Sequence, residues 1–296
     1  MHLNDILQIT DIRINPGDSA FLIDDGTNAL MYDSGFGFTG YAVADKVQKI
    51  LGGRSLQYIF LTHSHYDHAY GSAYVSARYP DVTVVAGEYA ASVFDRPSAK
   101  TMMRKLDRTF ADKCGVGEYE DRSENLRVDI AASDGDVIGF GDLEFEVLNL
   151  PGHTKCSIGY YCPQLKLLLG CETLGVFNGE DDVVPACLVG YQMTVNSIKR
   201  VKELDIENIL VPHFGLLDIE TSRFYLSKAL ESTTKTASEI CTMIQNGNSK
   251  TEIVEYFKTK FYKGYIKEIY PVDAMELNTG IMINLFAREI CGTEIA

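Results

Sequence analysis

The stretch Thr62-His63-Ser64-His65-Tyr66-Asp67-His68 places three of the six histidines of the chain within six residues. It directly follows residues 56–61, an apolar run that predicts a buried strand. Side chains of an extended segment alternate with period two, so His63 and His65 point the same way. A turn after Tyr66 directs the side chains of Asp67 and His68 toward a neighbouring point. One short loop is therefore expected to supply ligands to two adjacent metal ions.

Two more histidines follow strand-like runs further along the chain. His153 stands in Pro151-Gly152-His153-Thr154 after an apolar run, and His213 follows Pro212 after another. A single histidine is ordinarily a core or surface residue with a common hydrogen bond. Five in this arrangement favour metal ligands instead. Imidazole nitrogen suits Zn, Fe or Mn, and a carboxylate oxygen suits a second, harder position.

The order of elements predicts an α+β fold. Residues 20–33 form two apolar stretches around an Asp-Gly turn, as in a β-hairpin. Helices and strands then alternate, and later strands come in hairpins. This mixture favours two mainly antiparallel sheets with helices on their outer faces over a doubly wound parallel sheet. The further predicted elements are helices at 43–51 and 69–79 and strands at 82–86, 143–148, 157–162 and 165–169.

Two helical regions lie outside this pattern. Residues 98–114 predict a helix within an insertion of about residues 90–127, and the chain after Leu217 has no strand pattern. We expect a catalytic domain at 1–217 and a helical cap at 218–296 packed on it. The cap is expected to cover the active site or to form a homodimer interface. Its predicted helices are 221–245, 250–262 and 273–290.

Composition excludes several classes of protein. The formal net charge is -14, whereas a nucleic-acid surface needs clustered Lys and Arg. No uncharged apolar run approaches the length of about 18 residues that a membrane span needs, and the N-terminus has no signal-peptide pattern. The seven cysteines lack CxxC spacing, so reduced thiols are expected. These features predict a cytoplasmic protein with a small-molecule substrate.

The histidine run resembles the HxHxDH signature of the metallo-β-lactamase superfamily, over roughly residues 18–216. Four further features match that pattern in order: Asp33-Ser34-Gly35, the PGHT loop at 151–154, Gly170-Cys171-Glu172-Thr173, and Pro212-His213. The resemblance implies an αββα sandwich, here with an inserted helix and a helical C-terminal extension. Residues 173–177 and 213–217 look most like the quinolone-signal response subgroup, a thioesterase-like branch with a helical cap.

The resemblance also implies a set of metal ligands. His63, His65 and His153 would bind the first metal, and Asp67, His68 and His213 the second. The family has a bridging Asp where this chain offers Glu172, with Cys171 just before it. Glu172 is favoured as the bridge because the following residues continue the family pattern, and the Cys171 thiolate is the alternative. Asp33 would hydrogen-bond near the metal loop without coordinating.

The implied activity is hydrolysis that depends on two divalent metal ions (Zn, Fe or Mn). A metal-activated hydroxide would attack a small ester or thioester, and Asp67 would orient it or accept the proton. A lactonase or phosphodiesterase of the same superfamily is the nearest alternative. An iron-dependent redox enzyme, and a metal-containing regulatory protein that acts through a partner, are alternatives of other classes.

Overall fold

The computed structural model describes residues 2–294. Within it the chain forms two compact units. Among the described residues, unit 1 comprises residues 2–149 and 158–170, and unit 2 comprises residues 150–157 and 171–294. The expected division at residue 217 stays a prediction.

The first sheet of unit 1 contains six strands in the order β1 to β6. The predicted hairpin is confirmed, because Phe21 pairs with Tyr32 and Asp24 with Ala29 across an antiparallel ladder. From β3 onward, however, neighbouring strands run parallel. The prediction of mainly antiparallel pairing is wrong here, since a helix connects each strand to the next and returns the chain in the same direction. The strands are β1 (Gln8–Asp11), β2 (Phe21–Asp24), β3 (Ala29–Tyr32), β4 (Tyr58–Phe60), β5 (Thr83–Gly87) and β6 (Ile130–Ala132).

A second set of strands in unit 1 is antiparallel throughout, as predicted. It contains β7 (Val137–Phe140), β8 (Leu143–Asn149), β9 (Ile158–Cys162) and β10 (Leu167–Leu169). The Phe60 ring of β4 stacks on Tyr160 of β9 with centroids 4.4 Å apart. The Tyr160 hydroxyl also donates to the Leu61 carbonyl at 2.9 Å. The second set of strands therefore fixes the end of β4, where the histidine loop begins.

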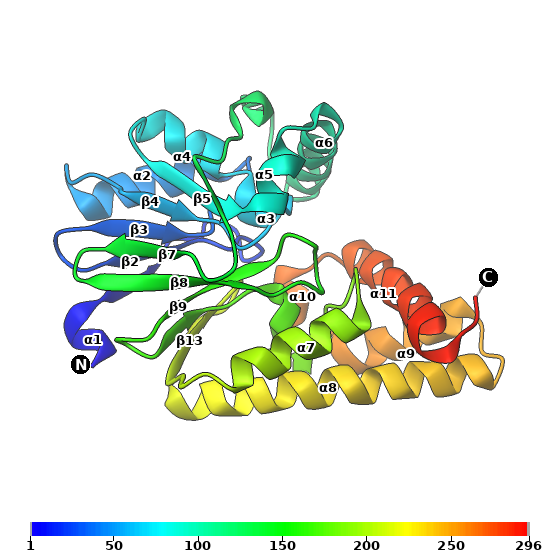
Figure 1. The fold of residues 1–296 in the computed structure, drawn as a ribbon. Helices are drawn as coiled ribbons and strands as arrows, with labels where there is room; N and C mark the ends of the chain where they lie inside the picture. The colour runs from blue at the N-terminus through cyan, green and yellow to red at the C-terminus, as the bar shows by residue number, and fades with distance from the viewer. Residues whose placement is uncertain (1, 295–296) are drawn as a thin grey trace. The chain divides into compact units, whose positions relative to one another are not determined.

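The helices of unit 1 include α2 and α4, which pack on each other (Figure 1). The inserted helix is confirmed as α6. The predicted helix at 69–79 is interrupted at Gly71, whose N–H donates to the Gly35 carbonyl at 2.9 Å. A Cβ at Gly71 would lie 1.9 Å from the Ser34 oxygen, so only glycine permits this approach. The helices are α1 (Leu3–Ile6), α2 (Gly40–Leu51), α3 (Tyr66–Ala69), α4 (Ser72–Arg78), α5 (Glu88–Phe94), α6 (Pro97–Lys113) and η1 (Ser123–Asn125).

Unit 2 contains the helical tail (Figure 1). The predicted break near residue 247 is confirmed, since α9 begins with a capping box between Ser249 and Glu252. Asp218 caps α8 by accepting from the Thr221 N–H at 2.8 Å. Among the described residues, no helix is long and apolar enough to cross a membrane. The elements are η2 (Glu172–Leu174), β11 (Val176–Phe177), β12 (Val183–Val184), α7 (Tyr191–Lys202), β13 (Asn208–Val211), β14 (Gly215–Leu217), α8 (Ile219–Gln245), α9 (Lys250–Phe261), α10 (Ile266–Ile269), α11 (Val272–Phe286) and η3 (Ala287–Cys291).

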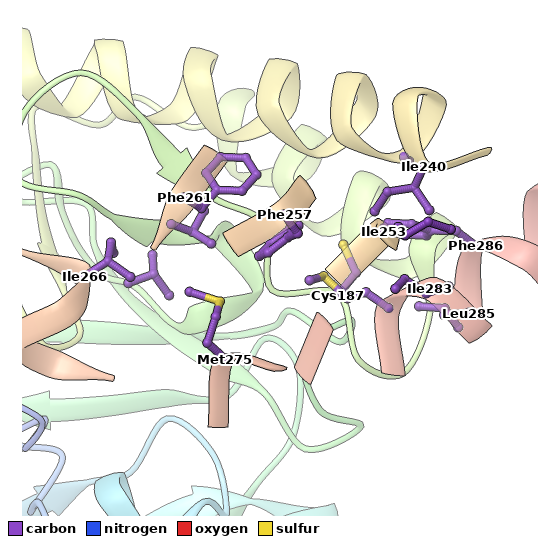
Figure 2. Close-up of a cluster of buried hydrophobic side chains, with 14 of the residues drawn as sticks. Cys187, Ile240, Ile253, Phe257, Phe261, Ile266, Met275, Ile283, Leu285 and Phe286 are labelled. Carbon is purple, nitrogen blue, oxygen red and sulfur yellow. The ribbon is translucent and has the colours of Figure 1, made fainter. Parts of the chain in front are cut away.

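One apolar cluster holds the tail together. Figure 2 shows Ile240 of α8, Phe257 and Phe261 of α9, and Ile283 and Phe286 of α11 within it. The same cluster includes three residues of the segment between η2 and α7, namely Val176, Val184 and Cys187. The tail helices are thus packed against the segment that follows Glu172.

Candidate metal centre

The histidine loop leaves β4 and is held by one buried carboxylate. Asp33 accepts the Thr62 N–H at 2.8 Å on one oxygen. Its other oxygen accepts the Thr62 hydroxyl at 3.0 Å and the Ser19 hydroxyl at 2.8 Å. Asp33 has φ of +52°, a strained conformation for a residue other than glycine. The surrounding hydrogen bonds hold that conformation and so fix where the loop starts.

The side chains of this loop gather at one point of unit 1. The His63 ring lies 4.6 Å from that of His65 and 4.0 Å from that of His68, between centroids. The His68 Nδ1 lies 2.7 Å from Asp33 Oδ2 and donates to it. The other nitrogen, Nε2, faces Asp67 Oδ2 at 3.6 Å and is an acceptor when the ring is neutral. Asp33 therefore hydrogen-bonds to residues of the histidine loop, and its predicted role of orienting a metal ligand stays a prediction.

In unit 2, the Pro-Gly-His-Thr loop fixes His153 from two sides. The His153 N–H donates to the Thr173 hydroxyl at 3.2 Å, and Nδ1 donates to the Ala186 carbonyl at 3.0 Å. Gly152 has φ of +149°, and a Cβ there would lie 2.3 Å from Thr194 Oγ1. Glycine is therefore required just before His153.

Glu172 begins the short helix η2 and is buried. One carboxylate oxygen lies 2.8 Å from His153 Nε2, and the other lies 3.4 Å from His213 Nε2. His213 has φ of +62°, which is a strained conformation for a residue other than glycine. The Glu172 carboxylate thus lies between the two histidines of unit 2, and its choice over Cys171 as the bridging ligand stays a prediction.

Three tyrosines of the helical tail support this part of the centre. The Tyr270 hydroxyl donates to Glu172 Oε1, and the Tyr265 hydroxyl donates to the His213 carbonyl. The Tyr225 hydroxyl of α8 donates to the Gly175 carbonyl at 2.7 Å. Burial raises the pKa of Tyr225 well above its ordinary value, and the nearby Glu172 adds to this, so it stays a neutral donor. Sequence reasoning missed these roles, because no motif contains Tyr270 or Tyr265.

The donor chemistry of both units fits divalent metal ions. The His153 ring donates through Nδ1, so in its neutral form Nε2 is an acceptor, and it faces a second acceptor, the Glu172 oxygen, at 2.8 Å. The pair formed by His68 Nε2 and Asp67 has the same character. Such a pair is stable only with a cation between the two atoms, either a proton or a metal ion. Imidazole nitrogens beside carboxylate oxygens are the donor set of Zn, Fe and Mn sites.

Comparison with known proteins shows the family. Residues 17–213 match the model of the Metallo-beta-lactamase superfamily. The chain belongs to this superfamily. The matched residues contain all seven side chains predicted as ligands. They comprise two groups, one in each unit: His63, His65, Asp67 and His68 in unit 1, and His153, Glu172 and His213 in unit 2.

Solved structures of the superfamily confirm the fold class. A metallo-beta-lactamase family protein from Thermus thermophilus aligns with a TM-score of 0.63 at 16% identity, covering 96% of this chain and 92% of that one. An archaeal superfamily protein from Sulfolobus tokodaii aligns with a TM-score of 0.55 at 16% identity, covering 76% and 84%. At this identity the likeness concerns the fold.

Curated relatives match only parts of their own sequences. A hydroxyacylglutathione hydrolase from Thermosynechococcus vestitus is 28% identical over 122 residues, which are 41% of this chain and 36% of that protein. An acyl-coenzyme A thioesterase, MBLAC2, from Gallus gallus is 28% identical over 178 residues, 57% of this chain and 61% of that protein. The matched segment therefore spans about a third of the first relative and about three fifths of the second. The subgroup predicted from the sequence stays a prediction.

Proposed function

We propose that this chain is a metal-dependent hydrolase that cleaves a small ester or thioester. In the proposed site, His63, His65 and His153 hold one divalent ion, and Asp67, His68 and His213 hold a second. Glu172 serves both. Membership of the superfamily supports this assignment, since every one of these residues lies within the matched segment.

The observation that carries the proposal is the pairing of acceptors in each unit. Nδ1 of His153 donates to a backbone carbonyl and Nδ1 of His68 to Asp33, so both rings present Nε2 to a carboxylate. Structural histidines usually complete their hydrogen bonds with one donor and one acceptor. Fixing one nitrogen and aiming the other at a carboxylate is instead the way that proteins orient histidine ligands.

When bound, two divalent ions supply Lewis-acid polarisation of the scissile carbonyl and lower the pKa of a water molecule. The protein contributes orientation and proton handling. Asp33 and the Ala186 carbonyl fix the rings of His68 and His153. Asp67, whose side chain is 15% exposed, can orient the water and receive its proton. In thioester hydrolysis the C–S bond breaks, the oxygen of water joins the acyl carbon, and the thiolate leaves and is protonated.

Ester or thioester substrates are favoured over the alternatives. The two relatives described above carry names that refer to hydrolysis of hydroxyacylglutathione and of acyl-coenzyme A. Both compounds are thioesters. The charge of -14 disfavours nucleic-acid phosphodiesters, because clustered cations are needed to bind their backbone.

The test is a substrate panel with the full chain loaded with zinc, iron or manganese. Acyl-coenzyme A, S-acylglutathione, aryl ester, lactone and phosphodiester substrates are compared, and oxygen consumption is recorded in parallel. We expect turnover of thioesters or esters that a chelator abolishes. His65→Ala should abolish it, whereas the matched variant His2→Ala, at an exposed histidine outside the site, should not. Turnover of phosphodiesters alone, or oxygen consumption without hydrolysis, would refute the proposal.

A further inference from the structure

Unit 2 contains a small pocket beside the ligands of the proposed site. Its volume is about 30 Å³. Its apolar wall comes from strands β11 and β12, the segment between β12 and α7, and helices α9 and α11. The main contributors are Val184, Leu188, Phe257, Met275 and Met282. Figure 2 shows Phe257 and Met275 among the side chains of the apolar cluster of the tail.

The pocket adjoins the chemistry of the site at two residues. His153, whose Nε2 faces Glu172, forms part of its wall, and so does Tyr270, whose hydroxyl donates to Glu172. A substrate whose reacting carbon lies beside Glu172 and His153 therefore has this pocket within reach of its adjoining carbons. The only other polar side chain among the described wall residues is the amide of Asn278.

The chemistry of the wall decides which end of a substrate fits. The described wall residues include no Asp, Glu, Lys or Arg. The thiol part of a coenzyme A or glutathione thioester carries several charges, and their burial here would be costly. An acyl chain carries none. Each methylene transferred from water into an apolar pocket strengthens binding about fourfold.

We propose that this pocket is the acyl subsite of the enzyme and that it selects a short, unbranched acyl group. This inference rests on the proposed hydrolase function. The volume sets the length, since about 30 Å³ holds only a small group before the wall moves. Met275 and Met282 are flexible side chains that can rearrange to admit a few more carbons. Phe257, which is fully buried, limits the depth.

Three variants change the pocket in opposite directions. Leu188 is half-buried at the wall, so Leu188→Trp narrows the pocket without overpacking the core. Met275→Ala widens it, and Leu188→Ala is a second widening variant in case the buried substitution prevents folding. Leu277→Trp is the matched control, because Leu277 lies on the same helix α11 but is 63% exposed.

The first measurement is kcat/KM for acetyl, butanoyl, hexanoyl, decanoyl and benzoyl thioesters of one thiol. We expect Leu188→Trp to lower the hexanoyl-to-acetyl ratio at least tenfold and the widening variants to shift the optimum to longer chains. Leu277→Trp should match the wild type. A wild-type enzyme that hydrolyses thioesters, with ratios unchanged in all these variants, would overturn the subsite and leave the hydrolase standing.

The second measurement does not depend on turnover. Calorimetric titration of the zinc-loaded protein with acetate and hexanoate gives the contribution of the chain, since both carry the same carboxylate. We expect hexanoate to bind more tightly in the wild type and in Leu277→Trp, and this gain to vanish in Leu188→Trp. If the gain is present but no thioester or ester is hydrolysed, the proposed function fails while the apolar subsite stands. An equal affinity for both acids in the wild type would overturn the subsite.

Discussion

The hydrogen bond from Tyr270 to Glu172 gives the sharpest test of how the tail serves the metal centre. Tyr270 precedes α11, and its hydroxyl donates to Glu172 Oε1 while its ring lies edge-on to His213 at 5.7 Å. Tyr270→Phe removes this donor and leaves the ring in place. The buried carboxylate of Glu172 then loses one of the groups that orient it.

The expected loss can be worked out from this contact. A hydrogen bond to a charged acceptor contributes about 1.5–3 kcal/mol. Since about 1.4 kcal/mol corresponds to tenfold in an equilibrium constant, metal affinity should fall by about tenfold to a hundredfold. Removal of groups that orient metal ligands typically weakens binding by about the same 10–100-fold. We therefore expect zinc affinity to fall within that range in Tyr270→Phe.

The assay is titration of metal-free protein with zinc in competition with a chromophoric chelator. Tyr256→Phe is the matched control, because the Tyr256 hydroxyl of the tail donates at 2.6 Å to the carboxylate of Glu239, which lies outside the proposed site. It should bind zinc like the wild type. In the background of Glu172→Asp, whose carboxylate is set back by one carbon, loss of the Tyr270 hydroxyl should cost much less. Unchanged zinc affinity in Tyr270→Phe would refute the reasoning and leave the tyrosine a role in packing only.

Three other predictions concern the groups that support the site and the inserted helix. Asp33→Asn should weaken zinc binding about 10–100-fold, because an amide cannot accept from both Thr62 and His68 as the carboxylate does; isothermal titration checks this. Gly152→Ala should lower the melting temperature and zinc occupancy, whereas Gly139→Ala, with open space at its Cβ, should do neither. Burial raises the pKa of Asp107 from 3.8 to about 7. At pH 4 the carboxyl group is therefore protonated in the folded protein. As the pH rises to 7, the folded protein loses about 4 kcal/mol of stability relative to the unfolded chain. We therefore expect the free energy of unfolding of Asp107→Asn, measured in urea, to rise relative to that of the wild type between pH 4 and 7. A difference that stays constant over this pH range would contradict the prediction.

The parts of the fold that the sequence predicts are those set by local pattern. The hairpin at 20–33 follows from turn chemistry between two apolar runs, and the break at Asn246-Gly247-Asn248-Ser249 follows from a capping signal. The histidine loop belongs to the same kind, because four predicted ligands within six residues need no tertiary information. In contrast, nothing local distinguishes a parallel neighbour from an antiparallel one. The parallel pairing of β3 to β6 depends on how each connecting helix packs.

Long-range contacts explain what the sequence could not show. Tyr270 and Glu172 are separated by 98 residues, and only the packing of the tail in unit 2 brings them together. Asp107 of the inserted helix likewise accepts the Gly37 and Phe38 N–H groups, 70 and 69 residues away. No local pattern around Asp107 or Tyr270 indicates these contacts, because in each case the partner lies far along the chain.

The substitution of Glu for Asp and the tyrosine of the tail are best understood as one feature. A glutamate has one more rotatable bond than an aspartate, and its carboxylate lies about 1.5 Å further from the backbone. Left to itself, such a side chain would lose more conformational freedom on binding a metal. The Tyr270 hydroxyl and the rings of His153 and His213 contact its two oxygens from different sides, so much of that freedom is already lost in the folded protein.

A relative with aspartate at this position would gain less from such a hydroxyl, because its carboxylate is already held closer to the backbone. If Glu172 is the proposed ligand, we therefore expect it to depend on the helical tail, and we expect a tail without a donor at position 270 to favour aspartate at position 172.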